Sequence, residues 1–185
     1  MRKELIKVLT AAVIAASIFV FPAEKSLAAT AEAIDADVDR AIEIFKDIKG
    51  ADNVLTKAKG ILVFPIVLKA GLGIGGEFGE GALRINGKTV DYYNTAAASI
   101  GFQLGGQKKT IIIAFLDENA LRRFRESSGW KIGADASVAV IAIGAGGAID
   151  SASLNEPIVG VVFGQKGLMY NLTLEGAKIT KIRKK

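Results

Sequence analysis

The sequence predicts an α+β domain in which a strongly bent antiparallel sheet, approaching a barrel, is covered by N-terminal helices and one short inserted helix. Three observations predict this class. Glycine-rich stretches alternate with apolar residues at strand spacing over Lys69–Gly81 and Thr95–Gly106. Asn86-Gly87 lies between them and is a strong signal for a tight hairpin. An apolar stripe at helical spacing precedes both stretches over Thr30–Lys49.

The two glycine-rich stretches predict neighbouring strands with one face of large residues and one face of small residues. Glycine weakens a strand unless the chain must bend sharply or let a backbone or a ligand approach closely. We therefore expect the small-residue face of the sheet to lie against another surface. Its glycines are Gly71, Gly73, Gly75, Gly101 and Gly105.

Residues 1–28 have the layout of a secretory signal peptide. Basic residues among the first seven positions precede an uncharged apolar run, Val8–Phe21, and the small residues Ser26 and Ala28 precede a cleavage position. The apolar run is shorter than the roughly 20 residues of a membrane-spanning helix. We expect cleavage near Ala28, which leaves residues 29–185 as a single domain. The alternative is that the segment is kept as an anchor. The product is expected to be periplasmic or secreted, and without cysteine it must fold without disulfides.

Caps and helix breakers place the remaining helices. Helices are expected at Thr30–Lys49, Asp52–Lys59 and Asp117–Ser127, each capped by its first residue. Pro65 is expected to end a buried strand that begins at Ile61, because proline cannot donate a ladder hydrogen bond.

Glycines and apolar runs place the later turns and strands. Two more turns are expected at residues 105–108 and 164–167, each rich in glycine. The continuous apolar run over residues 138–143 predicts a strand that is covered on both faces.

Catalytic chemistry has few candidates in this sequence. Gly71–Gly76 formally matches G-x-G-x-x-G, but no helix pattern follows it, so a nucleotide site is not expected. The sequence has no His, which removes imidazole-based nucleophile pairs and imidazole metal sites. Asp135 lies in a small-residue run before an apolar strand. We expect it to be a structural residue bonded to backbone amides, with an oxygen-ligand cation site or an acid pair as the alternative. No cofactor and no resident metal are predicted.

Basic residues predict an anionic partner. The net charge is +5, a weak excess, and exposed aromatic residues are not interleaved with the basic ones, so nucleic acid is not expected. Clustered cations can instead meet lipid headgroups or phosphate, and the alternative is an ordinary solvated face. The candidate lipid- or anion-binding residues are Lys57, Lys59, Lys69, Arg122, Arg123, Arg125 and Lys131.

Several separated motifs resemble the core of the SYLF-domain family: Lys57–Pro65, Lys69–Gly81, Trp130–Ala139 and Leu172–Gly176. The likeness runs from about Ala31 to Ile182. The resemblance implies a lipid-binding domain, and it implies no catalytic residues in this sequence. Eukaryotic members are associated with phosphoinositide membranes and actin patches, whereas bacterial relatives are mostly exported, stand-alone proteins. For an exported chain the lipid association applies, and an actin partner is not expected.

The leading hypothesis is therefore non-catalytic binding of lipid, or of an anionic membrane surface, in the bacterial cell envelope. One alternative is a structural or protein-interaction scaffold whose partner is another envelope protein. A second alternative is an enzyme that uses carboxylates, with Asp135 among them, and an oxygen-bound cation.

Overall fold

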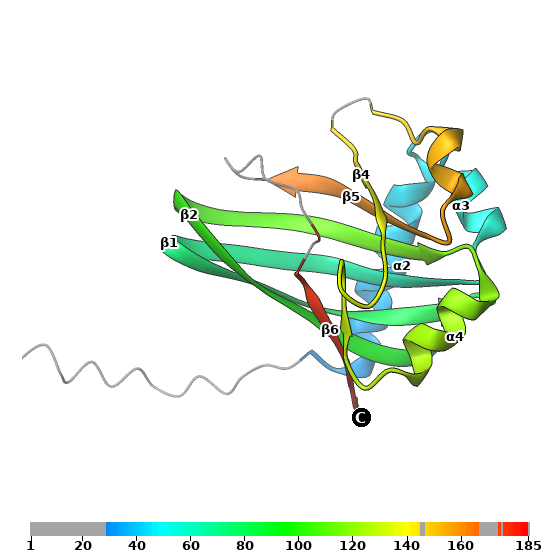
Figure 1. Ribbon diagram of the computed structural model, residues 1–185, viewed down its shortest axis with the longest axis horizontal. Helices are drawn as coiled ribbons and strands as arrows, with labels where there is room; N and C mark the ends of the chain where they lie inside the picture. The colour runs from blue at the N-terminus through cyan, green and yellow to red at the C-terminus, as the bar shows by residue number, and fades with distance from the viewer. Residues whose placement is uncertain (1–28, 145–146, 167–173, 175, 185) are drawn as a thin grey trace, which may run out of the picture.

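The computed structural model describes residues 29–144, 147–166, 174 and 176–184, apart from the side chains of residues 71–74 and 99–105. The predicted signal peptide lies outside these ranges. The described residues form one strongly curled sheet of six strands with helices on both of its faces (Figure 1). The predicted α+β class with a strongly bent sheet is thus confirmed.

One long hairpin dominates the sheet. Strand β1 (Gly60–Ile85) pairs along its whole length with β2 (Lys88–Phe115). The turn between them is Asn86-Gly87, and both residues have positive φ, 50° and 74°. This is the conformation that a two-residue hairpin turn needs, which confirms the hairpin predicted from the sequence.

The hairpin bends in its glycine-rich middle, so that each strand has two limbs. Gly71 pairs with Gly105 and Gly73 pairs with Gly101, which leaves one residue of β1 opposite three of β2. Such an irregularity bends a strand pair sharply. We call residues 60–71 with 105–115 the proximal limb and residues 73–85 with 88–101 the distal limb.

Each limb carries its own further strands. The proximal limb of β2 pairs with β5 (Ile158–Lys166), which pairs in parallel with the edge strand β4 (Ala139–Ala142). The distal limb of β2 pairs with β6 (Lys178–Ile182), which pairs with β3 (Trp130–Lys131). Figure 1 shows the hairpin reaching to the left and returning, with β5 and β6 on different parts of it.

Glycines allow the two limbs of β1 to cross closely. A Cβ added at Gly79 would lie 2.7 Å from the carbonyl oxygen of Ile66, and one at Gly81 would overlap the carbonyl oxygen of Val63. Both obstacles are backbone atoms, which cannot move aside as a side chain can. A close approach to the bare face of β1 therefore occurs at Gly79 and Gly81, and the surface that approaches is the same strand. For the glycines named from the sequence, Gly71, Gly73, Gly75, Gly101 and Gly105, a close approach stays a prediction.

Two cores fill the faces of the curled sheet. The first lies between the two limbs and α4 (Glu118–Glu126), and contains Tyr93, Phe115, Phe124 and Trp130. The second lies under α2 (Ala31–Lys46) and α3 (Ala51–Lys57). A short 3₁₀ helix, η1 (Ser151–Asn155), adds Leu154 to this second core.

Two of the three predicted helix caps are correct. The Thr30 hydroxyl accepts the N–H of Ala33 at 3.2 Å, and the Asp117 carboxylate accepts the N–H of Ala120 at 2.8 Å. Asp52 is not a cap, because α3 begins one residue earlier, after Gly50 with φ of 91°. A Cβ at Gly50 would lie 2.6 Å from the carbonyl oxygen of Ile149, so this start is decided by a tertiary contact.

Three strand predictions were wrong. Strand β1 continues through Pro65, which lies in a register irregularity where a missing N–H is tolerated. Residues 105–108 are not a turn, because their pairing with the proximal limb of β1 continues unbroken in β2. Strand β4 is not covered on both faces: it is an edge strand with alternating exposure, and Val140 is exposed.

The predicted turn at residues 164–167 is only partly within the described residues. Strand β5 continues through Gly164 to Lys166 instead of turning at Gly164. The expected return strand lies outside the described residues.

Candidate functional site

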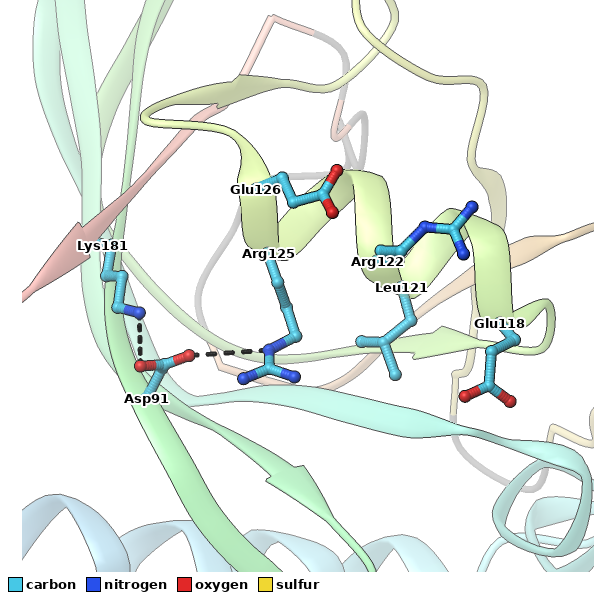
Figure 2. A pocket seen from close by; sticks show the side chains of 7 residues that line it. All are labelled: Asp91, Glu118, Leu121, Arg122, Arg125, Glu126 and Lys181. Atoms are coloured by element: carbon cyan, nitrogen blue, oxygen red, sulfur yellow. Dashed lines mark ion pairs between the residues drawn. The ribbon is translucent and has the colours of Figure 1, made fainter.

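Arg122 and Arg125 of α4 border a cleft between that helix and the distal limb. The cleft encloses about 440 Å³, and Figure 2 shows Asp91 of β2 between Lys181 of β6 and Arg125 of α4. Asp91 lies 2.5 Å from the Lys181 ammonium and 3.8 Å from Nε of Arg125. The charged residues that line the cleft are Arg122, Arg125, Lys181, Asp91, Glu118 and Glu126. Three cations thus face three acids, so the cleft holds no net charge to attract an anion.

Burial also raises the pKa of a tyrosine close to this cleft. Tyr93 pairs with Lys181 across β2 and β6, and its side chain lies in the core beside Phe124. Burial first, and the negative charge of Asp91 second, raise the pKa of Tyr93 to about 12. The phenol is therefore neutral at physiological pH and is not an acid–base group there.

A buried ion cluster lies between the limbs near the bend. Glu77 of the distal limb lies 3.2 Å from the ammonium of Lys69 and 2.7 Å from that of Lys109, both on the proximal limb. The Lys109 side chain is only 1% exposed. Each cation needs the carboxylate because a charge out of water is costly without a partner. The cluster therefore joins the two limbs electrostatically.

Helix α2 is fixed to the distal limb through its acidic face. The Asp35 carboxylate accepts hydrogen bonds from the Thr89 hydroxyl at 2.6 Å and the Tyr92 hydroxyl at 2.8 Å. Arg84 donates to Asp39 at 2.6 Å and lies 3.4 Å from Asp35. Burial, followed by the hydrogen bond to Asp35, raises the pKa of Tyr92 to about 12. Asp35 and Asp39 are thus attachment points of the helix rather than a free acidic face.

A smaller groove of about 240 Å³ lies between α2 and the proximal limb. Its apolar lining includes Ile44, Ile66 and Phe163. Two lysines line it as well: Lys108 of β2 and Lys166 of β5, which are both exposed and lie directly opposite each other. Like charges in directly opposed positions of a sheet repel. The groove thus combines an apolar wall with two adjacent, exposed cations.

Residues 96–185 match the family model described as Ysc84, Las17-binding protein actin regulator, which is the SYLF domain. Over these residues the chain is similar to the SYLF-domain family. No curated protein matches the chain in a sequence comparison. The SYLF family is a lipid-binding family.

The matched segment of the chain contains both lysines of the groove. It begins in the distal limb of β2 and covers α4 and strands β3 to β6. Lys108 and Lys166 lie inside it, whereas Ile44 and Ile66 come from residues before it. The groove is therefore a joint product of the matched segment and of α2 and β1.

The basic residues predicted from the sequence do not form one site. Arg122 and Arg125 share the α4 cleft, and Arg122 also donates to Asn119 at 2.8 Å. Lys57 and Lys59 lie in a separate cleft with Asp117 and Glu156. Lys69 is in the buried ion cluster.

The remaining predicted cations are Arg123 and Lys131, which are both exposed. Lys131 of β3 lies directly opposite Lys178 of β6. The sequence did not indicate Lys108, Lys166 or Lys178 as site residues, because their proximity depends on strand pairing.

Asp135 is exposed, in the turn after β3. Its carboxylate accepts the backbone N–H of Lys131 at 2.6 Å, the kind of contact expected for a structural residue. Gly133, in the same turn, has φ of 89°. Among the described residues, no three acidic side chains lie close enough together to hold a metal ion. None of the described helices combines the length and apolar character required to span a membrane.

Proposed function

We propose that this protein binds anionic lipid at a membrane surface of the bacterial cell envelope, without catalysing a reaction. One observation carries this proposal: four exposed lysines form two directly opposed pairs, Lys108 with Lys166 and Lys131 with Lys178. Among the described residues, none of these four forms an ion pair with an acid. An anionic surface would relieve the repulsion within each pair.

Several other cations of the described chain are neutralised by acids. Lys181 and Lys184 are paired with Asp91 and Glu80, at 2.5 Å and 2.7 Å. Arg40 and Lys46 are paired with acids one turn away on α2. These four cations have acidic partners within the fold, whereas each opposed lysine pair holds two positive charges side by side with no acidic partner among the described residues.

The location of this lipid surface is inferred from residues 1–28. Their signal-peptide pattern favours export and cleavage near Ala28, which gives a periplasmic or secreted protein. The matched family is described as an actin regulator, and an exported bacterial protein would not meet actin. An envelope protein is the alternative partner, and it would bind without any requirement for anionic lipid.

Vesicle flotation tests the proposal. The full chain, expressed with its own N-terminus so that any processing occurs, should float with phosphatidylglycerol-containing vesicles and not with pure phosphatidylcholine vesicles. Binding should weaken as ionic strength rises above about 0.15 M, because surface attraction is screened. Absence of flotation with either composition at low ionic strength would contradict the proposal. Equal flotation with both would show that anionic charge is not what is recognised.

A further inference from the structure

A β-bulge brings Lys108 and Lys166 together. In the β2–β5 ladder Thr110 pairs with Phe163, but the next pair toward the bend is Lys108 with Lys166. Two residues of β5, Gly164 and Gln165, thus lie opposite the single residue Lys109. Gly164 has φ of 64°, the left-handed conformation that such a bulge uses. Without the extra residue, Lys166 would point to the opposite face of the sheet from Lys108.

The opposed lysines face the groove with little compensation from acids. Asp37 is the acidic residue among those that line the groove, and its carboxylate is already paired with Arg40 at 2.9 Å. The lining therefore has three cations and one acid. The strand pairing holds both ammonium groups on one face, where a single phosphate can meet both.

The apolar side of the groove includes a residue of α2 that lies outside the buried stripe of that helix. Ile34, Val38, Ala41 and Phe45 of α2 are buried in the core, whereas Ile44 is 52% exposed and lines the groove. Ile66 of β1 and Phe163 of β5 lie in the same lining. A solvent-facing isoleucine beside two cations forms a small amphipathic surface, apolar on one side and basic on the other.

The size of the groove limits what can occupy it. Pockets that enclose a whole small molecule usually hold about 300–1,000 Å³. At about 240 Å³ this groove can cover a headgroup and the adjoining part of an acyl chain, not a complete phospholipid. The occupant is therefore a lipid that remains in its bilayer.

We infer that Lys108 and Lys166 hold the phosphate of an anionic glycerophospholipid, while Ile44, Ile66 and Phe163 contact the first part of its acyl chains. This inference rests on the proposed function and specifies the surface by which the domain binds the bilayer. The bulge at Gly164 is the feature that forms the phosphate-binding pair, and α2 supplies the apolar wall.

A comparison of two lysine pairs tests the inference. The test is vesicle flotation of the full chain at about 0.15 M salt. The double variant Lys108→Gln, Lys166→Gln should partition onto phosphatidylglycerol vesicles about tenfold less than wild type. The matched control is the double variant Lys131→Gln, Lys178→Gln. It removes the same charge from the other opposed pair, which does not line this groove. It should lower partitioning by about threefold or less.

If wild type binds but both double variants lose the same amount, the groove has no special role and the inference is overturned, while the proposed function stands. If wild type does not bind, the proposed function itself fails.

The apolar half of the site has its own test. Ile44→Asn should weaken binding to phosphatidylglycerol vesicles severalfold, whereas Val90→Asn, at another exposed apolar position, should not. Inorganic phosphate added at constant ionic strength should not release the protein, because it lacks the acyl chain. Release by phosphate, with Ile44→Asn behaving as wild type, would show a bare anion site and overturn the lipid assignment.

Stability distinguishes binding from a structural role. Removing two opposed like charges should leave the melting temperature of the Lys108→Gln, Lys166→Gln variant unchanged or slightly higher. A clearly lower melting temperature would mean that the lysines serve the fold, and the inference would be overturned.

Discussion

Two consecutive residues of β2, Lys108 and Lys109, belong to regions of opposite character. Lys109 points between the limbs, where it is almost completely buried and lies 2.7 Å from Glu77. Lys108 points to the groove beside α2, where it is exposed and lies opposite Lys166. The role of a lysine in this protein therefore depends on which face of the sheet its side chain occupies. On the interior face the limb-joining lysines share the acid Glu77, whereas the outer face can leave its charge for a ligand.

The same contrast separates the two clefts. In the α4 cleft Asp91 is shared between Lys181 and Arg125, so its charges serve the packing of α4 and β6. In the groove beside α2 the lysines have no acidic partner among the described residues. The number of basic residues does not distinguish these regions, but the presence of acids does.

The largest expected effect comes from breaking the interior cluster. Glu77→Gln should lower the free energy of unfolding by about 3–5 kcal/mol, because it leaves Lys69 and Lys109 buried without an anion. Urea unfolding measures this. Glu43→Gln is the control: it removes an exposed ion pair with Lys46 and should change stability by less than about 1 kcal/mol. Similar effects of the two variants would contradict the contrast between interior and surface charges.

A smaller effect is expected at the bulge that aligns the groove lysines. Gly164→Ala should lower the free energy of unfolding by about 1–2 kcal/mol, because φ of 64° disfavours a residue with a Cβ. Space is not the obstacle, since the nearest atom to an added Cβ, Oγ1 of Thr110, is 3.6 Å away. If the bulge aligns Lys166, flotation should also weaken in this variant. Unchanged lipid binding together with reduced stability would show that the bulge serves only the fold.

The smallest expected effect concerns the attachment of α2, which forms one wall of the groove, and this effect depends on pH. Tyr92→Phe removes one hydrogen bond to Asp35 and should lower the free energy of unfolding by about 0.5–1 kcal/mol at neutral pH. The pKa of Tyr92 is raised from 10.0 to about 12, so the folded state favours the protonated phenol. Its contribution to stability is therefore complete below pH 10 and is lost as the pH rises from 10 to about 12.

Urea unfolding of wild type and of Tyr92→Phe over this alkaline range checks the prediction. The stability difference between the two proteins should shrink as the phenol of Tyr92 ionises. A difference that stays constant through pH 12 would contradict the link between the raised pKa of Tyr92 and its hydrogen bond to Asp35.

Local signals in the sequence predicted the local structure well. Thr30 and Asp117 cap their helices, and Asn86-Gly87 forms the hairpin turn, because each feature depends on hydrogen bonds and dihedral angles within a few residues. The family likeness was also correct over residues 96–185. The sheet is bent as predicted, but the predictions of a turn at residues 105–108 and of a strand end at Pro65 were wrong.

The sequence by itself determined the caps of α2 and α4, the hairpin turn, the family resemblance and the presence of a basic excess. Only the tertiary structure decided which cations are neutralised and which are free to bind. The physical reason is that side-chain charge acts over a few ångströms, and residues far apart in the chain reach that distance through strand register. A bulge of one residue at Gly164 sets Lys166 beside Lys108. The bend in the glycine-rich middle brings Glu77 to Lys69 and Lys109.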